Sequence, residues 1–222
     1  MVTLVTLAAN LSFAADPDKV NIGVLHKDDL HVVQQVLYPK VGRTEFSAAV
    51  GIMPFDPYLT TPNAQLSFDI HQREQMSIGV VLGGGYGFKT AVTRTMESPA
   101  FGVAPYAYRY LASALVGVSW SPIYAKMSLG GAKILHYDVY LAGRAGATLE
   151  TSVIPGGGLP VGPTLSPGLG MRLFLKERMA LRAEFRDDLV LQRRKLTSSW
   201  ALKQNANLVV GLSFLSGRQA KR

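Results

Sequence analysis

The sequence predicts an all-β fold, specifically an antiparallel up-and-down transmembrane β-barrel of eight strands. Three observations predict it: apolar and polar residues alternate along several segments, short turns alternate with long loops, and a high apolar content comes without a segment suited to a membrane helix. Hydrophobic residues make up 48% of the 222 residues and charged residues only 17%, whereas soluble domains carry about 25% charged residues.

The two longest uncharged stretches cannot form a stable helix. Pro122 interrupts the stretch between Arg109 and Lys126, and residues 151–171 contain six glycines and four prolines. The apolar surface must therefore lie on strands. The chain has no cysteine, which permits a periplasmic or surface location without establishing one.

The net charge of +8 does not by itself predict nucleic-acid binding. Lysines and arginines are mostly scattered singly, with Arg193-Arg194-Lys195 as the longest run, and no zinc spacing, aromatic RNA-binding motif or basic helix accompanies them. Contact with the phosphates of outer-leaflet glycolipid explains a basic rim at least as well. We therefore expect outer-membrane lipid and lipopolysaccharide as partners, with periplasmic or envelope proteins as further candidates.

Side chains at every second position share one face of a strand. In the first such segment, Phe46 and Ala48 alternate with Glu45 and Ser47. The predicted strands are residues 43–52, 63–71, 76–90, 105–120, 124–149, 164–175, 179–192 and 204–214. The fifth is too long for one crossing, so Gly130-Gly131 is expected to mark a bend or a bulge.

The connections between these strands alternate in length. Short polar turns are predicted at Gln72–Gln75, Ser121–Ile123 and Lys176–Arg178. Longer loops rich in proline and glycine are predicted at Met53–Pro62, Ala91–Ala104, Thr151–Pro163 and around Arg193–Lys203. Short turns at one end and long loops at the other are typical of outer-membrane barrels, whose short end is periplasmic.

Alternation alone does not say which face is wet. A soluble lipocalin-like barrel keeps its apolar face inside, and a membrane barrel reverses this arrangement. The faces that carry Arg, Glu and Asp also carry Gly and Ser, which suits a narrow polar interior, so Phe185 and Leu212 should face lipid. Aromatic residues near predicted strand ends suit the lipid–water boundary: Phe46, Tyr58, Tyr86, Phe88, Tyr106, Tyr108, Trp120, Tyr124, Trp200 and Phe214.

The chain is predicted to have four parts. Residues 1–14 are the remnant of a signal peptide, because Val2 to Ala15 is apolar and Ser12-Phe13-Ala14 resembles a secretory cleavage site; an ordinary first strand is the alternative. Residues 15–42 are a periplasmic pre-barrel segment, 43–216 the outer-membrane β-barrel and 217–222 a basic tail. The pre-barrel segment, with a short helix or extended arm over Leu30–Leu37, either docks a partner, plugs the lumen or is an unstructured leader.

The order of several motifs resembles an outer-membrane β-barrel domain family common in myxobacteria and related Gram-negative bacteria. The motifs are His31-Val32-Val33-Gln34-Gln35, Lys40-Val41-Gly42-Arg43, Glu45-Phe46, Asp56-Pro57-Tyr58, His71 with Glu74, Pro122–Lys126 and His136–Gly143. The sequence departs from the family pattern at Ala125, where glycine is expected, and at Arg144, where a small residue is expected. The resemblance implies a barrel in the bacterial outer membrane. Some similar barrels belong to envelope-spanning or gliding-motility assemblies.

Charged residues on the polar strand faces are the main candidate site. They are Glu45, Asp69, Asp138, Arg144, Arg172, Arg182, Glu184 and Arg186. The lumen of an eight-stranded barrel is just filled by side chains, and buried charges are tolerated only when they are paired. We therefore expect an internal salt-bridge plug, with a proton or ion path as the alternative.

The histidines and glycine runs do not predict catalytic chemistry. His26 and His31 make no recognisable metal site, and Gly83–Gly85 and Gly156–Gly158 are not followed by the residues of a phosphate loop. A lipid A deacylase needs a His–Ser pair with a carboxylate on the outward rim. His136, on one strand face with Asp138, is instead expected inside the barrel or at its periplasmic end.

Two function classes follow. The first is a non-enzymatic outer-membrane barrel that serves as an envelope scaffold or anchor, with no catalytic residue, metal or cofactor. The second is a narrow channel or small-ligand porter. A lipid-modifying outer-membrane enzyme comes third.

Overall fold

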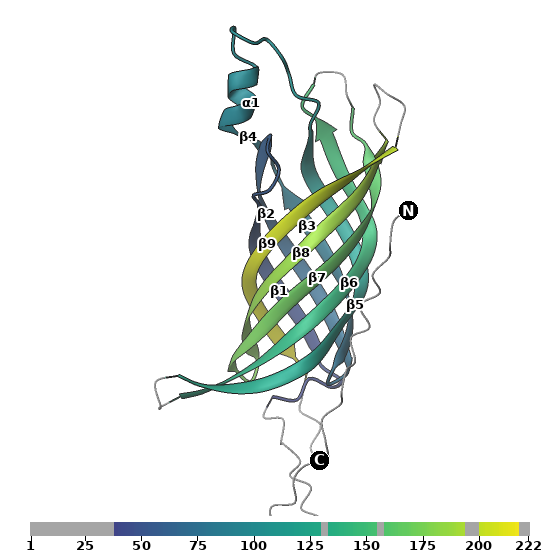
Figure 1. Cartoon of the computed structure of the whole chain (residues 1–222). Helices are drawn as coiled ribbons and strands as arrows, with labels where there is room; N and C mark the ends of the chain where they lie inside the picture. The colour runs from purple at the N-terminus through teal and green to yellow at the C-terminus, as the bar shows by residue number, and fades with distance from the viewer. Residues whose placement is uncertain (1–37, 130–132, 155–157, 194–199, 218–222) are drawn as a thin grey trace, which may run out of the picture. The chain divides into compact units, whose positions relative to one another are not determined.

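The structure, a computed structural model, describes residues 38–129, 133–154, 158–193 and 200–217 (Figure 1). Almost all of the regular structure is antiparallel β-sheet. The elements are β1 (Thr44–Met53), β2 (Leu59–Arg73), β3 (Met76–Gly85), β4 (Phe88–Lys89), α1 (Ala91–Met96), β5 (Tyr108–Leu129), β6 (Lys133–Ser152), β7 (Val161–Lys176), β8 (Met179–Arg193) and β9 (Trp200–Ser216).

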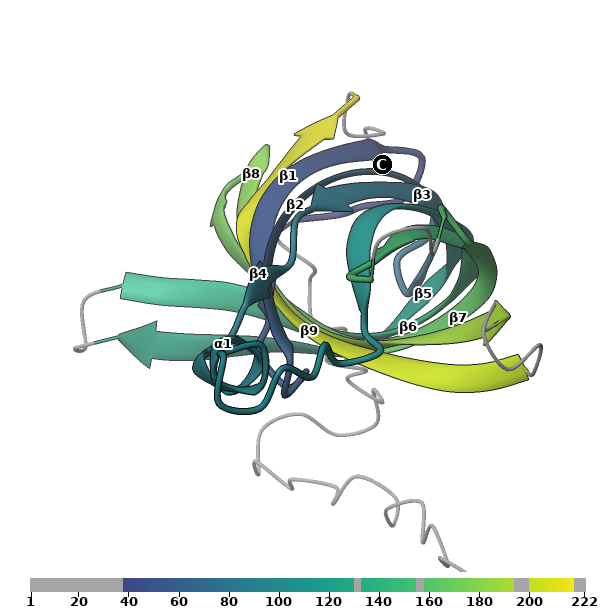
Figure 2. The same cartoon turned by 90° about the horizontal axis from the view of Figure 1, so that it is seen from above.

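Eight of these strands close into a ring, which confirms the predicted fold class (Figure 2). β1 closes it, because Ala48 lies opposite Leu66 of β2 on one side and Leu212 of β9 on the other. The other strands pair with their neighbours in chain order. β4 pairs only with the outer end of β2, at Leu59 and Thr60, and is not a member of the ring.

Long and short connections lie at opposite ends of the barrel. Residues 74–75 link β2 to β3, and residues 177–178 link β7 to β8. The connection from β3 to β5, at the other end, is long enough to carry β4 and α1, which lie at the top of Figure 1. Among the described residues, no helix is both long and apolar enough to cross a membrane.

The predicted short turn at Ser121–Ile123 is wrong. β5 continues through it to Leu129, and its register against β6 shifts between Trp120 and Ile123. Proline lacks an N–H donor, so within sheets it occurs at edges and bulges; Pro122 lies at such a bulge. The predicted strand 124–149 therefore divides between β5 and β6, and the predicted strand 76–90 ends at Gly85. The predicted bend at Gly130-Gly131 lies outside the described residues.

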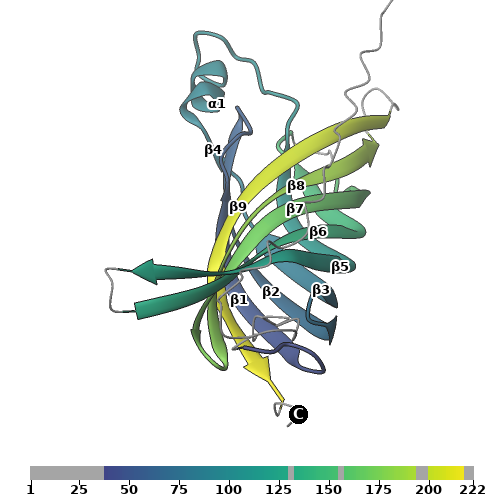
Figure 3. The same cartoon turned by 60° about the horizontal axis from the view of Figure 1, so that its bottom comes forward.

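β5 and β6 extend beyond the barrel wall as a two-stranded ribbon. The β3–β5 ladder ends at Met76 and Trp120, followed by a hydrogen bond from Ser121 N to Gln75 O at 2.7 Å. β6 meets β7 only from His136 onward. The intervening residues, described for 122–129 and 133–135, project from the short-turn end, and we name them the β5–β6 ribbon (Figure 3).

Several predicted segments lie outside the described residues. These are the signal-peptide remnant 1–14, most of the pre-barrel segment with His26, His31 and Leu30–Leu37, the glycines at 156 and 157, and the basic run at 194–195. Of the pre-barrel segment the structure describes residues 38–42, and of the basic tail only Gly217.

Candidate functional site

The barrel wall separates apolar from polar side chains along the middle of β2, from Asn63 to His71. Leu66, Phe68 and Ile70 point outward and are 46–49% exposed. The intervening residues Ser67 and Asp69 point into the lumen and are 6% and 2% exposed. The same alternation places Phe185 and Leu212 on the outer wall, as predicted. The polar face is therefore the interior, and the functional chemistry must be sought there.

Glu45, near the start of β1, binds partners from three other strands. Its Oε1 accepts a hydrogen bond from Arg172 Nε at 3.2 Å, and Arg182 Nη1 lies 3.8 Å from the same oxygen. Its Oε2 lies 2.8 Å from Nε2 of His71. All four side chains are buried, so these contacts replace the water that each charged group would otherwise bind.

Glu184 on β8 binds two arginines, Arg144 and Arg182. Arg144 donates from both terminal nitrogens, at 2.5 and 3.0 Å, in the forked geometry that suits a carboxylate. Arg182 donates to Glu184 Oε2 at 2.9 Å and to Asp69 Oδ2 at 3.1 Å. Arg182 thus bridges Glu45, Asp69 and Glu184 across the lumen.

Asp138 connects this cluster to the segment before the barrel. Its Oδ2 accepts from Arg172 Nη1 at 3.3 Å and from Nζ of Lys40, which is only 2% exposed. Burial lowers the pKa of the Lys40 ammonium, an effect that the Asp138 carboxylate opposes. Four carboxylates thus meet four cations in what we name the charged network: Glu45, Asp69, Asp138, Glu184, Lys40, Arg144, Arg172 and Arg182.

Tyr140 occupies the centre of the charged network. Its hydroxyl donates to Glu184 Oε2 at 2.6 Å and accepts from Arg182 Nε at 2.6 Å. The guanidinium carbons of Arg172 and Arg182 lie 4.3 and 4.9 Å from the centroid of its ring, within the range of cation–π attraction. The ring therefore fills the space between two like charges and stabilises both.

Two glycines make room for these large side chains. A Cβ at Gly170, opposite Tyr140 on β7, would lie 2.2 Å from the Tyr140 ring, and one at Gly79 would lie 2.1 Å from Oδ1 of Asp69. Either contact is far inside van der Waals range. Glycine on the inner face is thus a packing requirement of the charged lumen.

Arg186 lies apart from the other seven predicted residues. It is 1% exposed, and its ion-pair partner is Asp188, with Nε 3.4 Å from Oδ1. Asp188 also accepts from the Ser166 hydroxyl at 2.5 Å. The structure therefore brings seven of the eight predicted residues into one network, and Lys40 is the fourth cation there in place of Arg186.

Lys40, His71, Tyr140 and Asp188 were missing from the predicted set. Tyr140 and Asp188 could have been found, because each is two residues from a predicted member on the same strand face. His71 likewise shares the inner face of β2 with Asp69. Lys40 gave no periodic signal, since it precedes the first strand.

The residues before β1 close the short-turn mouth of the lumen. The Tyr38 ring stacks on Phe174 with centroids 5.5 Å apart and meets His136 edge-on at 5.3 Å. Arg43 donates to the backbone oxygens of Leu215 at 3.1 Å and Glu177 at 3.0 Å. Ring contacts and backbone hydrogen bonds therefore hold Lys40 against Asp138 from both sides.

The long-loop half of the lumen contains neutral hydrogen bonds beside the Arg186–Asp188 ion pair. Asn63 Nδ2 donates to Asn207 Oδ1 at 3.0 Å, and the Thr164 hydroxyl donates to Thr148 at 2.7 Å. We name these four residues the amide–hydroxyl layer. Nearer the outer mouth, Lys203 Nζ lies 3.2 Å from Oε1 of Glu150.

His136 has no catalytic surroundings in the described structure. It lies at the short-turn end between the Tyr38 and Tyr124 rings, and Asp138 on the same strand binds Lys40 and Arg172. The carboxylate is thus engaged in ion pairs, and the histidine is far from the long-loop rim. Among the described residues, no group of three His, Asp or Glu side chains could hold a metal ion.

The predicted aromatic belt holds for part of its members. Trp200 and Phe214 lie near the two ends of β9, and Trp120 lies where the β3–β5 ladder ends. All three are on the outer wall and are 47–60% exposed. Tyr108 is only 3% exposed, because it points inward and its hydroxyl pairs with that of Tyr106 at 2.7 Å. The prediction that Tyr108 belongs to the belt is therefore wrong.

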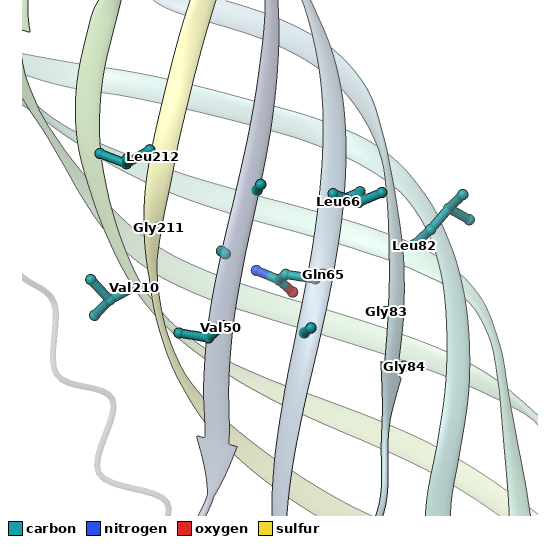
Figure 4. Close-up of a pocket in the computed structure, with 12 residues that line it drawn as sticks. Val50, Gln65, Leu66, Leu82, Gly83, Gly84, Val210, Gly211 and Leu212 are labelled. Carbon is teal, nitrogen blue, oxygen red and sulfur yellow. The ribbon is translucent and has the colours of Figure 1, made fainter.

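The outer wall also carries a shallow apolar groove of about 700 Å³ across β9, β1, β2 and β3 (Figure 4). Small residues at Ala48, Ala64 and Gly84 leave the hollow between larger neighbours. The larger outward side chains are Val50, Leu66, Leu82, Val210 and Leu212. None of the lining residues is titratable, and the groove is mainly apolar.

This polarity decides the environment of the barrel. A closed sheet satisfies its backbone hydrogen bonds internally, and an apolar outer wall around a charged interior is stable only in lipid. The sorted loops and the even number of strands are those of bacterial outer-membrane barrels. The chain is a transmembrane β-barrel of the bacterial outer membrane.

Comparisons with known proteins return barrels of this kind. No protein-family model matches the chain, and no curated protein matches it. The N-terminal β-barrel domain of Pseudomonas aeruginosa OprF is 9% identical, with a TM-score of 0.47, over 79% of this chain and 98% of that one. Neisserial surface protein A is 10% identical, with a TM-score of 0.49, over 78% of this chain and 95% of that one. Ail of Yersinia pestis is 11% identical, with a TM-score of 0.43, over 79% and 99%. The assignment above rests on the polarity of the barrel itself.

Proposed function

We propose that this protein is a closed, non-enzymatic outer-membrane barrel that serves as an envelope scaffold or anchor. The charged network is the observation that supports the proposal. Its four carboxylates and four cations cross the lumen in mutual contact. An ion that passed through would have to separate these pairs in a confined, poorly hydrated space, which is costly.

The residues before β1 add a second closure. Lys40 and Tyr38 occupy the short-turn mouth, where they contact Asp138 and Phe174. A pore would need both this segment and the network to rearrange. A narrow channel or small-ligand porter is therefore the less favoured function.

The proposed partners are of two kinds. Outer-leaflet lipopolysaccharide suits the basic residues at the long-loop end, where Arg94 is exposed and the Arg109 guanidinium lies 5.2 Å from the Tyr86 ring centroid. The resemblance to the myxobacterial barrel family supports a place in an envelope-spanning or gliding-motility assembly. Purification of the barrel from native membranes with its bound proteins tests the second proposal.

Conductance in planar bilayers tests the closed lumen. The unmutated barrel should show no steady conductance. Lys40→Met should then open a leak or lower stability, because it leaves Asp138 with Arg172 as its one described cation. Lys126→Met, at an exposed lysine of the same end, is the matched control and should change neither property. A stable, ion-selective conductance of the unmutated protein would contradict the scaffold proposal and support a channel.

A further inference from the structure

One edge of β5 is open along the β5–β6 ribbon. Among the described residues, β5 loses its neighbour on the β3 side after Ser121, and its backbone from Pro122 to Leu129 pairs only with β6. Such an edge presents unpaired N–H and C=O groups that can pair with another strand. Pro122, which lacks an N–H group, lies at the barrel end and leaves the rest of the edge able to pair.

The two faces of the ribbon differ in polarity. Ile123, Ala125 and Met127 continue the outward face of β5, and Ile123 and Met127 are 52% and 44% exposed. Across the ribbon, their partners on β6 are Val139, Tyr137 and Leu135. The opposite face of β5 carries Tyr124, Lys126 and Ser128. One face is thus apolar, and the other holds the only charge of this β5 edge.

We propose that the open edge of β5 pairs antiparallel with the same edge of a second copy of this chain, centred on Ala125. In that register Ile123 lies opposite the partner's Met127, and Tyr124 lies opposite the partner's Lys126. The two ribbons then form a four-stranded sheet with one continuous apolar face. Each copy contributes the same residues, as a twofold interface requires.

Alternative registers are less favourable. Centring on Lys126 places two like charges directly opposite each other, which destabilises a strand pair. Centring on Tyr124 leaves Met127 opposite Ser121, whose N–H is already bonded to Gln75. A shift by one residue would pair the apolar face of one copy with the polar face of the other. The sequence of this edge is therefore most complementary to itself about Ala125.

The proposed dimer also allows both barrels to cross the same membrane in the same orientation. Antiparallel strands that share a face are related by a twofold axis perpendicular to their sheet. The ribbon projects sideways from the barrel wall in Figures 1–3. An axis through it can therefore lie along the membrane normal, which leaves both barrels upright in one membrane. The projection also keeps the second barrel clear of the first.

Cysteine cross-linking tests the proposal, since the chain has no cysteine of its own. Directly opposite residues have Cβ atoms about 4.5–5.5 Å apart, close to disulfide geometry. Ala125→Cys in native outer membranes, with copper–phenanthroline as oxidant, should give mainly a disulfide-linked dimer. Ile134→Cys, 67% exposed on the ribbon strand away from the open edge, is the control and should stay monomeric.

A mixed pair provides an independent check if Ala125→Cys fails to fold, as judged by heat-dependent gel mobility. Ile123→Cys and Met127→Cys chains should cross-link when they are co-expressed and not when each is expressed alone. Ala125→Glu, which opposes its own charge across the axis, should abolish the dimer found by native mass spectrometry. Equal cross-linking at Ala125 and Ile134, or no dimer from any folded variant, overturns the proposal.

Discussion

The two halves of the lumen have the same wall but different chemistry. Toward the short turns, Glu184, Arg144 and Arg182 form ion pairs at 2.5–3.0 Å within the charged network. Toward the long loops, Asn63 and Asn207 meet through a neutral amide hydrogen bond at 3.0 Å. Both regions lie on inward strand faces, so alternation alone does not distinguish them.

The two kinds of interior contact differ in how much stability is lost when one partner is removed. A neutral amide that loses its partner can bind water at modest cost, whereas a buried charge that loses its partner is strongly destabilising. Loss of a partner should therefore cost more in the charged network than in the amide–hydroxyl layer. Tyr140 and the facing Gly170 belong with the charged network, because the ring fits only where glycine leaves space.

Removal of one buried charge should have the largest effect on the free energy of unfolding. Glu184→Ala leaves Arg144 and Arg182 without their shared carboxylate, so we expect the free energy of unfolding to fall by about 3–5 kcal/mol. Asn207→Ala, in the amide–hydroxyl layer, should cost about 1–3 kcal/mol. Denaturant titration of the folded fraction in lipid vesicles measures both. Equal losses would mean that the charges are solvated and the pore is wider than inferred.

A charge introduced on the outer wall should cause the second largest loss of stability. Leu208 lies near the middle of β9 and is 45% exposed. Leu208→Arg should cost about 2–4 kcal/mol near the bilayer midplane, and Leu202→Arg, close to the long-loop end, about 0–1 kcal/mol. The same titration compares them. Indifference to Leu208→Arg would show that this face does not contact lipid.

A methyl group at an inward glycine should have a smaller effect. Gly170→Ala forces the Tyr140 ring to move, and overpacking of this kind costs about 1–3 kcal/mol. Gly143→Ala is the matched control, because a Cβ there meets nothing within 4 Å. Thermal unfolding followed by gel mobility gives the order. A neutral Gly170→Ala would show that the charged half is more plastic than its contacts indicate.

The smallest expected effect is the coupling energy between the two asparagines of the amide–hydroxyl layer. A double-mutant cycle on Asn63→Ala and Asn207→Ala should give a coupling of about 0.5–1.5 kcal/mol, the net value of a neutral hydrogen bond. The corresponding cycle on Arg144 and Glu184 should give a larger coupling, since both groups are charged and buried. Equal couplings would remove the distinction between the two halves.

The sequence by itself determined the fold class and the polarity of each strand. Period-two alternation along β2 and β9 is a local property, because it follows from the backbone of a strand. The same alternation places Glu45, Asp69 and Arg182 on the polar faces of their strands, and the Gly and Ser residues on those faces predict that they line a narrow interior. These predictions depend on neighbours in sequence only, and the structure agrees with them.

Tertiary structure decided what the alternation leaves open. Pro122 resembled a turn in the sequence, but at a bulge on an edge strand it permits β5 to continue. Arg186 shares the strand face of Arg182, yet pairs with Asp188. Lys40 reaches Asp138 from outside any strand, 98 residues away in sequence. Which charge meets which depends on strand register and on how the ring closes, and these are long-range properties that no local pattern encodes.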